Sequence, residues 1–108
     1  MNTITFSKNE WENIKSRLDN GKFVYTIRVD KELGKYNEGD VLRTEWGKEI
    51  KIISVKKING GIDGLKSEYQ FFNELTEKMM DELKDYDKME IISLMEIIKN
   101  SKSAVENN

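Results

Sequence analysis

Residues 20–29, which read NGKFVYTIRV, contain the change from helical to strand periodicity that decides the fold. Asn20 and Gly21 end the helical pattern before them, because glycine tolerates the left-handed backbone of a helix C-terminus. From Lys22 onward the side chains alternate, as they do on the two faces of a strand. One face carries Phe23, Tyr25, Ile27 and Val29, and the other carries Lys22, Val24, Thr26 and Arg28. The pattern predicts a strand over residues 22–29.

A helix precedes this strand, and a short strand over residues 4–6 precedes the helix. Ser7 and Glu10 have the spacing of a capping box, in which each side chain satisfies a backbone N–H at the helix start. The helix should therefore begin at Ser7. Its apolar face consists of residues three and four positions apart, namely Trp11, Ile14 and Leu18.

The rest of the chain alternates between strand and helix patterns. Residues 30–39 are polar with two glycines and predict a loop, and residues 40–46 and 49–58 predict a hairpin that turns at Gly47 and Lys48. Residues 59–61 end the strand pattern. Residues 66–84 have apolar residues at helical spacing, and residues 101–108 have the composition of a disordered polar tail. Residues 89–98 suit a strand because of their isoleucines, but Met, Glu and Leu would suit a helix as well.

These elements predict a single α+β domain over residues 1–100, with about five strands and two flanking helices. Five short strands would remove their exposed edges by closing into a small β-barrel. The hydrophobic content of 37% supplies a core despite 35% charged residues, so we do not expect global disorder.

The composition excludes several kinds of chemistry. The chain has no cysteine and no histidine, which excludes disulfides, zinc–thiolate sites and imidazole general bases. We expect no cofactor and no metal. No apolar run is long enough to cross a bilayer and the first residues do not resemble a signal peptide, so we expect a cytoplasmic protein without membrane contact.

The charge is unevenly distributed along the chain. The net charge is −2, with 12 basic and 9 acidic residues in positions 1–58 against 6 and 11 in positions 59–108. The total argues against a protein that coats nucleic acid by bulk attraction. The mildly basic first half suits one phosphate or a short strand of nucleic acid.

Thr26 and Arg28 are the most function-like residues. Two positions apart on a strand, they place a hydroxyl and a five-donor guanidinium roughly 7 Å apart on one face. Such a pair suits an anionic or carbonyl-bearing ligand. The alternative is a solvated strand face opposite a buried one, which fits the same pattern.

The order of these motifs resembles the ASCH domain of the PUA-like superfamily. The shared features are a helix, the Asn20-Gly21-Lys22 turn, the strand with Thr26 and Arg28, and a Gly39-Asp40 turn that enters the next strand. The resemblance extends from Phe6 to Lys99 and favours a strand over residues 89–98. It implies a small PUA-like β-barrel with a cleft beside Thr26 and Arg28.

The resemblance also implies functions. Family members are thought to bind RNA or nucleotides, and one bacterial branch hydrolyses the acetyl amide of N4-acetylcytidine with a lysine, a threonine and a glutamate. Carried onto this chain, these residues are Lys22, Thr26 and Glu68. The expected lysine position holds Phe23, and a shift of one residue turns a strand side chain to the opposite face. Lys22 can compensate only from a flexible turn.

Further candidates for ligand binding surround this strand. Arg28, Gly39 and Asp40 follow from the resemblance, while Tyr36 and Trp46 could stack on a base. The alternative is packing in the core or at the rim for Tyr36, and packing at the hairpin end on its own sheet for Trp46.

Three functions follow. The first is a nucleotide- or RNA-binding module, and the second is an amidohydrolase acting on an acylated nucleoside. The third is a protein-interaction or inhibitor module, because an acidic surface in the second half can meet a basic partner.

Overall fold

The computed structural model describes residues 2–68 and 75–97, and the expected tail over residues 101–108 lies outside them. Its five strands are β1 (Thr3–Ile4), β2 (Val24–Val29), β3 (Val41–Thr44), β4 (Glu49–Ile58) and β5 (Met89–Glu96). Its three α-helices are α1 (Trp11–Asp19), α2 (Gly61–Glu68) and α3 (Glu77–Leu83). Two 3-10 turns, η1 (Lys8–Glu10) and η2 (Asp30–Glu32), precede α1 and follow β2. The fold is α+β, as the sequence predicts.

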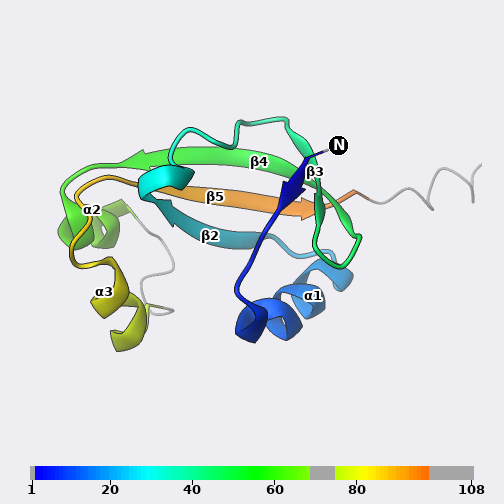
Figure 1. Ribbon diagram of the computed structural model, residues 1–108, viewed down its shortest axis with the longest axis horizontal. Coiled ribbons are helices and arrows are strands. Elements are labelled where there is room, and N and C mark those ends of the chain that lie inside the picture. Colours follow the sequence, from blue (N-terminus) through cyan, green and yellow to red (C-terminus); the bar gives the residue numbers. More distant parts are fainter. Residues whose placement is uncertain (1, 69–74, 98–108) are drawn as a thin grey trace, which may run out of the picture.

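The strands form one mixed sheet in the order β1-β3-β4-β5-β2 (Figure 1). β1 pairs with β3 in parallel, and the other pairs are antiparallel. The hairpin of β3 and β4 and the final strand β5 confirm two sequence predictions. The sheet is not closed into a barrel: β1 and β2 are its two edges and do not pair with each other.

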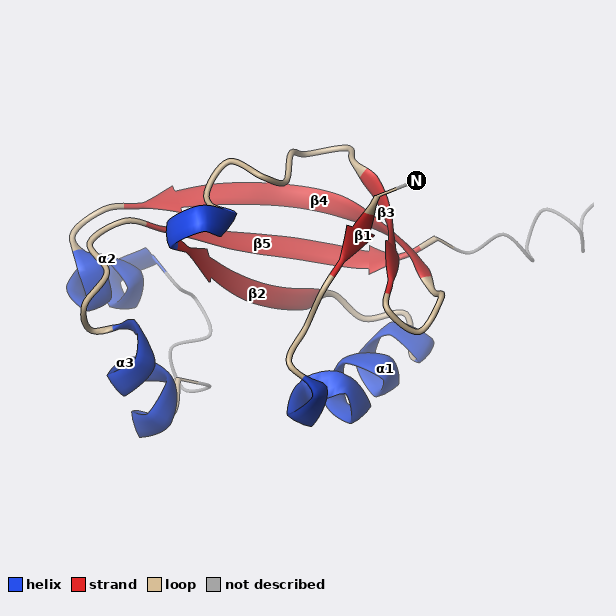
Figure 2. Ribbon diagram, viewed as in Figure 1, coloured by secondary structure: helices blue, strands red, loops and turns tan. Residues whose placement is uncertain are grey.

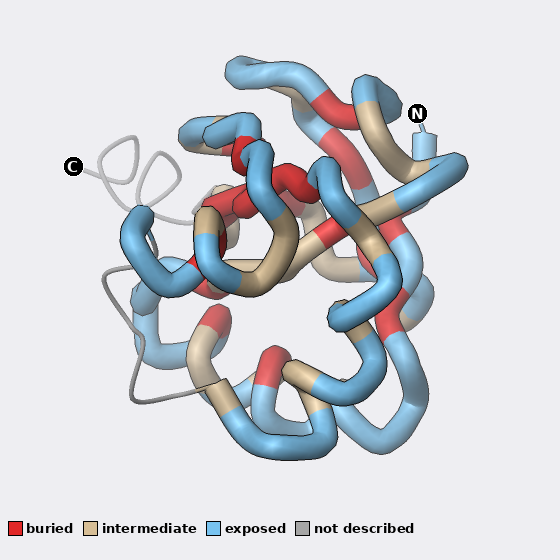
Figure 3. Tube along the Cα trace, turned by 90° about the vertical axis from the view of Figure 1, so that its left-hand side faces the viewer, coloured by how far each residue is buried: buried red, intermediate tan, exposed pale blue. Residues whose placement is uncertain are grey.

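Two hydrophobic clusters lie on opposite faces of the sheet, and Figure 2 shows α1 at one end of the sheet and α2 and α3 at the other. A first core cluster packs α1 residues Ile14 and Leu18 against the strands. A second cluster packs Leu65 of α2 and Leu83 of α3 against Met89 and the other face. Most buried residues lie on the strands, and Figure 3 shows the buried stretches of the chain with exposed segments around them. Because both faces are covered in part, the alternation on β2 does not separate a buried face from a solvated one.

A β-bulge in β4 allows one strand to serve both clusters. Ile52 pairs with Leu94 and Ser54 pairs with Ser93, which leaves Ile53 as an extra residue. An extra residue reverses the face of every side chain that follows it. Ile52 therefore packs in the first cluster and Ile58 in the second.

The helices differ from the sequence prediction in two places. The Ser7 side chain makes no capping hydrogen bond; its carbonyl instead accepts from the Glu10 N–H at 2.9 Å, so a 3-10 turn forms first and α1 begins at Trp11. The helix predicted over residues 66–84 corresponds to parts of α2 and α3. The Thr76 hydroxyl starts α3 by accepting from the Met79 N–H at 3.1 Å.

Two further observations bear on the ends of elements and on membranes. Gly21 has a φ of +70° and ends α1, as expected from the sequence. Among the residues that the structure describes, no helix is both long and apolar enough to span a bilayer.

Candidate functional site

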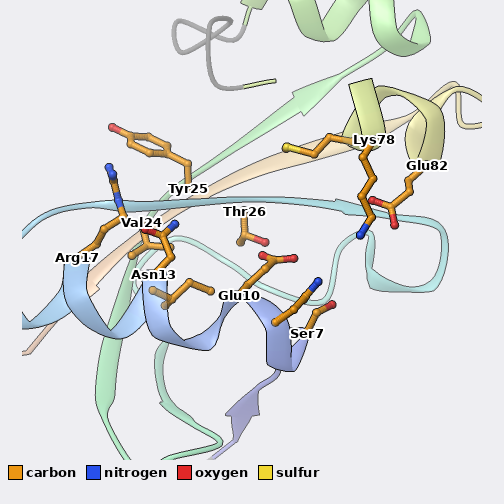
Figure 4. A pocket seen from close by; sticks show the side chains of 12 residues that line it. Ser7, Glu10, Asn13, Arg17, Val24, Tyr25, Thr26, Lys78 and Glu82 are labelled. Carbon is orange, nitrogen blue, oxygen red and sulfur yellow. The ribbon is translucent and has the colours of Figure 1, made fainter. Parts of the chain in front are cut away.

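A hollow of about 550 Å³ lies between α1, β2 and α3 (Figure 4). Thr26 lies at its back, Glu10 approaches from η1 and Asn13 from α1, and Lys78 and Glu82 approach from α3. Its full lining consists of Ser7, Asn9, Glu10, Asn13, Ile14, Arg17, Val24, Tyr25, Thr26, Lys78, Met79 and Glu82. Its volume is in the range of small-molecule sites, but its lining is more polar than is usual for them.

A second hollow of about 460 Å³ shares Ser7, Glu10 and Thr26 with the first. It follows β2 toward Arg28 and is lined on its other side by the segment after β1, with the residues Thr5, Phe6, Ser7, Glu10, Thr26, Ile27, Arg28 and Glu32. We call the two hollows together the β2 groove. It brings Thr26 and Arg28 to one site, as the sequence predicts.

Arg28 is buried, and each of its three guanidinium nitrogens makes a hydrogen bond within the protein. Its Nε donates to the Thr26 hydroxyl at 3.2 Å, its Nη1 pairs with Glu32 at 3.1 Å, and its Nη2 donates to the Thr5 carbonyl at 2.8 Å. The guanidinium carbon lies 5.2 Å from the Phe6 ring centroid and 5.4 Å from that of Tyr36. Arg28 therefore positions Thr26 and holds the groove together, which contradicts a solvated strand face.

Glu32 connects this arginine to the loop after β2. Its carboxylate accepts from Arg28, from Tyr36 at 3.2 Å and from Lys35 at 3.1 Å. Partial burial acts to raise the pKa of Glu32, but the hydrogen bonds and charges of these three residues lower it overall. Burial raises the pKa of Tyr36, and the Glu32 charge adds to this. Near neutral pH the network therefore consists of the Glu32 carboxylate, the Arg28 guanidinium, the Lys35 ammonium group and the neutral Tyr36 phenol.

Two other cations line the groove, one from each helix. Arg17 donates through Nε to the Phe23 carbonyl at 3.2 Å, and in the described part of the chain its two terminal nitrogens have no protein partner. Figure 4 shows Arg17 near Tyr25 at one side of the hollow and Lys78 beside Glu82 at the other. Within the described residues, the groove thus has a guanidinium with one hydrogen bond at one end and mixed charges elsewhere.

The structure places two of the predicted catalytic residues outside this groove. Lys22 is exposed in the turn before β2, and Phe23 is 42% exposed and packs near Tyr25, with ring centroids 6.3 Å apart. Neither lines the groove. Glu68, at the end of α2, pairs with Lys56 at 2.7 Å and is also absent from its lining. Only Thr26 of the predicted catalytic set lies in the groove.

Three of the predicted ligand-binding residues have structural contacts. Gly39 has a φ of +91° and donates to the Ile52 carbonyl at 2.8 Å, while the Asp40 carboxylate accepts from the Asn37 N–H at 2.8 Å. These bonds form the turn into β3. Tyr36 is buried beside Arg28. None of the three lines the groove.

Trp46 packs in an aromatic cluster. Its ring lies 5.3 Å from Trp11 and 6.0 Å from Phe6, measured between centroids, and Lys15 lies over it at 5.5 Å. Its buried Nε1 has no hydrogen-bond partner among the described residues. Trp46 also lies outside the groove lining, and its contacts are those of a partly buried packing residue.

The groove residues that sequence reasoning missed come from two helix faces. Glu10, Asn13 and Arg17 are three and four positions apart, so they share one face of the first helical segment. Lys78 and Glu82 have the same relationship on α3. The polar face of an amphipathic helix is normally a solvent-exposed surface. These two polar faces line a site only because β2 lies between the helices.

The groove shows no sign of a metal centre. In the described ranges, no group of three or more acidic side chains is arranged to hold a metal ion.

Comparison with protein-family models, curated proteins and solved structures finds no significant match. The function of the groove is therefore argued from its own residues.

Proposed function

We propose that this chain is a binding module and that the β2 groove takes a nucleotide or a short segment of single-stranded RNA. The observation that carries the proposal is Arg17, which lines the hollow beside Tyr25 and whose Nε is held by the Phe23 carbonyl at 3.2 Å. A guanidinium offers paired donors that match the oxygens of one phosphate.

The rest of the hollow suits a nucleoside attached to that phosphate. Asn13, Glu10 and Thr26 supply donors and acceptors for a base edge or a ribose, and the Tyr25 ring lines the same end as Arg17. An aromatic ring can contribute stacking energy to any base. The groove is therefore suited to shape and hydrogen bonding around one or two nucleotides.

The charges of the groove favour a small ligand over a long polyanion. Arg17 and Lys78 are offset by Glu10 and Glu82 in the first hollow. Long nucleic acids bind through many uncompensated cations, and this lining does not supply them. We expect weak dependence of the affinity on salt, equivalent to about one phosphate contact.

The resemblance to the ASCH domain supports the same proposal. Members of that family are thought to bind RNA or nucleotides, and Thr26 and Arg28, beside which the resemblance implies a cleft, both line the β2 groove.

An NMR titration of isotope-labelled protein tests the proposal. The ligands are the four nucleoside monophosphates, cytidine and a short RNA. We expect shifts at the amides of Arg17, Thr26 and Lys78. Arg17→Ala should weaken the binding of the monophosphates several-fold and leave the binding of cytidine unchanged. Arg43→Ala, an exposed arginine on β3 outside the groove, is the matched control. Absence of shifts at millimolar nucleotide would rule out the proposal.

Amidohydrolysis is the second candidate, because a different lysine lines the hollow with Thr26. Lys78, Thr26 and the carboxylates of Glu10 and Glu82 meet there, whereas Lys22 and Glu68 do not. An assay on N4-acetylcytidine should show turnover that depends on Lys78 and Thr26. If Lys78→Met and Thr26→Val turn over N4-acetylcytidine as fast as the wild-type protein, these residues are excluded as the catalytic set.

A further inference from the structure

The contact between Arg28 and Thr26 sets the direction of hydrogen bonding at the centre of the groove. An arginine side chain has five N–H donors and no acceptor, so the Thr26 hydroxyl is the acceptor in its 3.2 Å contact with Arg28 Nε. Among the described residues, no hydrogen bond uses the Thr26 hydroxyl proton. The hydroxyl therefore offers a donor to a ligand, and the ligand should present an acceptor to it.

Glu10 faces the same space with acceptors alone. Thr26 and Glu10 line both hollows, so they lie where the two hollows meet. The Glu10 side chain makes no capping hydrogen bond at the start of α1, and Figure 4 shows its carboxylate pointing toward Thr26. An ionised carboxylate accepts through two oxygens and donates nothing. The junction of the hollows thus offers one donor beside a pair of acceptors.

Arg17, Asn13 and Glu10 lead along one face of the first helical segment to this junction. They are three and four positions apart, and at 1.5 Å per residue Glu10 and Arg17 are separated by about 10 Å along the helix. A phosphate is attracted by the Arg17 guanidinium and would be repelled by the Glu10 carboxylate. A nucleotide therefore fits with its phosphate at Arg17, its ribose near Asn13 and its base between Glu10 and Thr26.

The Watson–Crick edges of the four bases differ in how they meet this arrangement. Guanine presents one acceptor, O6, followed by two neighbouring donors, N1–H and N2–H2. Two parallel N–H donors match the two oxygens of a carboxylate, and O6 can accept from the Thr26 hydroxyl. Adenine and cytosine present one amino donor beside a ring-nitrogen acceptor, and uracil presents one N–H between two carbonyls. Each of these three would place an acceptor against an oxygen of Glu10.

We propose that the β2 groove selects guanine nucleotides, with the Glu10 carboxylate on N1–H and N2–H2 and the Thr26 hydroxyl on O6. This inference rests on the proposed nucleotide binding and adds the base that is chosen. The paired hydrogen bonds to Glu10 supply most of the selection, because one good bidentate contact discriminates between bases by about tenfold.

The test on the ligand side compares four nucleoside monophosphates by NMR titration of the wild-type protein. Their bases are guanine, hypoxanthine, adenine and 2,6-diaminopurine. Hypoxanthine lacks only the N2 amino group of guanine, whereas diaminopurine keeps it but has an amino donor in place of O6 and no proton on N1. We expect each of the other three to bind about tenfold more weakly than guanosine monophosphate.

The outcomes separate this inference from nucleotide binding itself. Equal affinities for guanosine and adenosine monophosphates would overturn the selection of guanine and leave nucleotide binding intact. Absence of binding by all four ligands would contradict both.

Glu10→Gln tests the same contact on the protein side. Glutamine keeps one acceptor and places a donor against a donor of guanine. We expect guanosine monophosphate to bind this variant about tenfold more weakly, while the binding of adenosine monophosphate does not fall. The matched control is Glu12→Gln, an exposed neighbour outside the groove lining, which should bind both nucleotides as wild type does. An equal loss of both nucleotides in Glu10→Gln, or the same loss in Glu12→Gln, would overturn base recognition by Glu10.

Discussion

The Arg28 guanidinium donates to the Thr5 carbonyl at 2.8 Å and so joins the two edges of the sheet. Arg28 belongs to β2 and Thr5 follows β1, and these strands stand at opposite ends of the strand order. A side chain thus makes the connection that backbone pairing would make in a closed barrel. The same guanidinium holds Thr26 and Glu32, so the connection and the groove depend on one residue.

Replacement of Arg28 should therefore destabilise the fold. Arg28→Ala removes three hydrogen bonds, to Thr26, Glu32 and the Thr5 carbonyl, which should cost about 3 kcal/mol of unfolding free energy. The comparison is Arg43→Ala, whose exposed pair with Glu49 at 3.4 Å should contribute about 0–1 kcal/mol. Urea denaturation measures both, and equal costs would contradict a structural role for Arg28.

The Glu32 carboxylate should stabilise the protein only while it is ionised. Its folded pKa is lowered below the ordinary value of 4.5, so its contribution is fully present above pH 4.5 and is lost as the pH falls through the folded pKa. Glu32→Gln should thus lower the melting temperature at pH 7, and the difference from wild type should shrink below pH 4.5. A difference that is constant from pH 7 to pH 3 would contradict this linkage.

The two tryptophans should respond differently to the same substitution. The Trp11 Nε1 donates to the Phe6 carbonyl at 2.9 Å, whereas the buried Trp46 Nε1 has no partner among the described residues. Phe at position 11 loses a hydrogen bond, while Phe at position 46 removes an unsatisfied donor. Trp11→Phe should therefore cost about 1 kcal/mol more than Trp46→Phe in thermal unfolding. The reverse order would indicate that Trp46 has a partner in solution.

Glu68 should be dispensable for any activity of the groove. Its exposed pair with Lys56 at 2.7 Å should contribute no more than about 1 kcal/mol to stability. Glu68→Gln should bind nucleotides as wild type does and should retain whatever turnover of N4-acetylcytidine the protein has. Lys56→Met is the matched partner variant. A loss of turnover in Glu68→Gln alone would restore Glu68 as a catalytic candidate.

Local sequence patterns predicted most of the elements. Gly21 ends α1 where the sequence predicts it, and the hairpin and β5 have the expected strand structure. The open sheet could not be predicted, because whether β1 and β2 pair depends on their separation in space. The bulge at Ile53 was missed for the same reason, since alternation alone does not show where an extra residue lies.

The candidate site was predicted only at its centre. Thr26 and Arg28 share a strand, so their proximity follows from their spacing. Arg17 and Lys78 come from helices far apart in the sequence, and only tertiary packing brings them to the same hollow. Trp46 and Asp40 have residue types that suit both binding and packing, and their neighbours in the structure show packing contacts.

The extra residue in β4 limits which changes in chain length this protein can accept. Loss of Ile53 alone would leave the pairs of β4 with β5 as they are, because Ile52 would still face Leu94 and Ser54 would still face Ser93. Lys56 would stay opposite Ile91 and Ile58 opposite Met89, so both cores would keep their residues. Loss of a residue elsewhere between Ile52 and Ile58 would instead force some pairs to shift by one residue and turn those side chains to the opposite face.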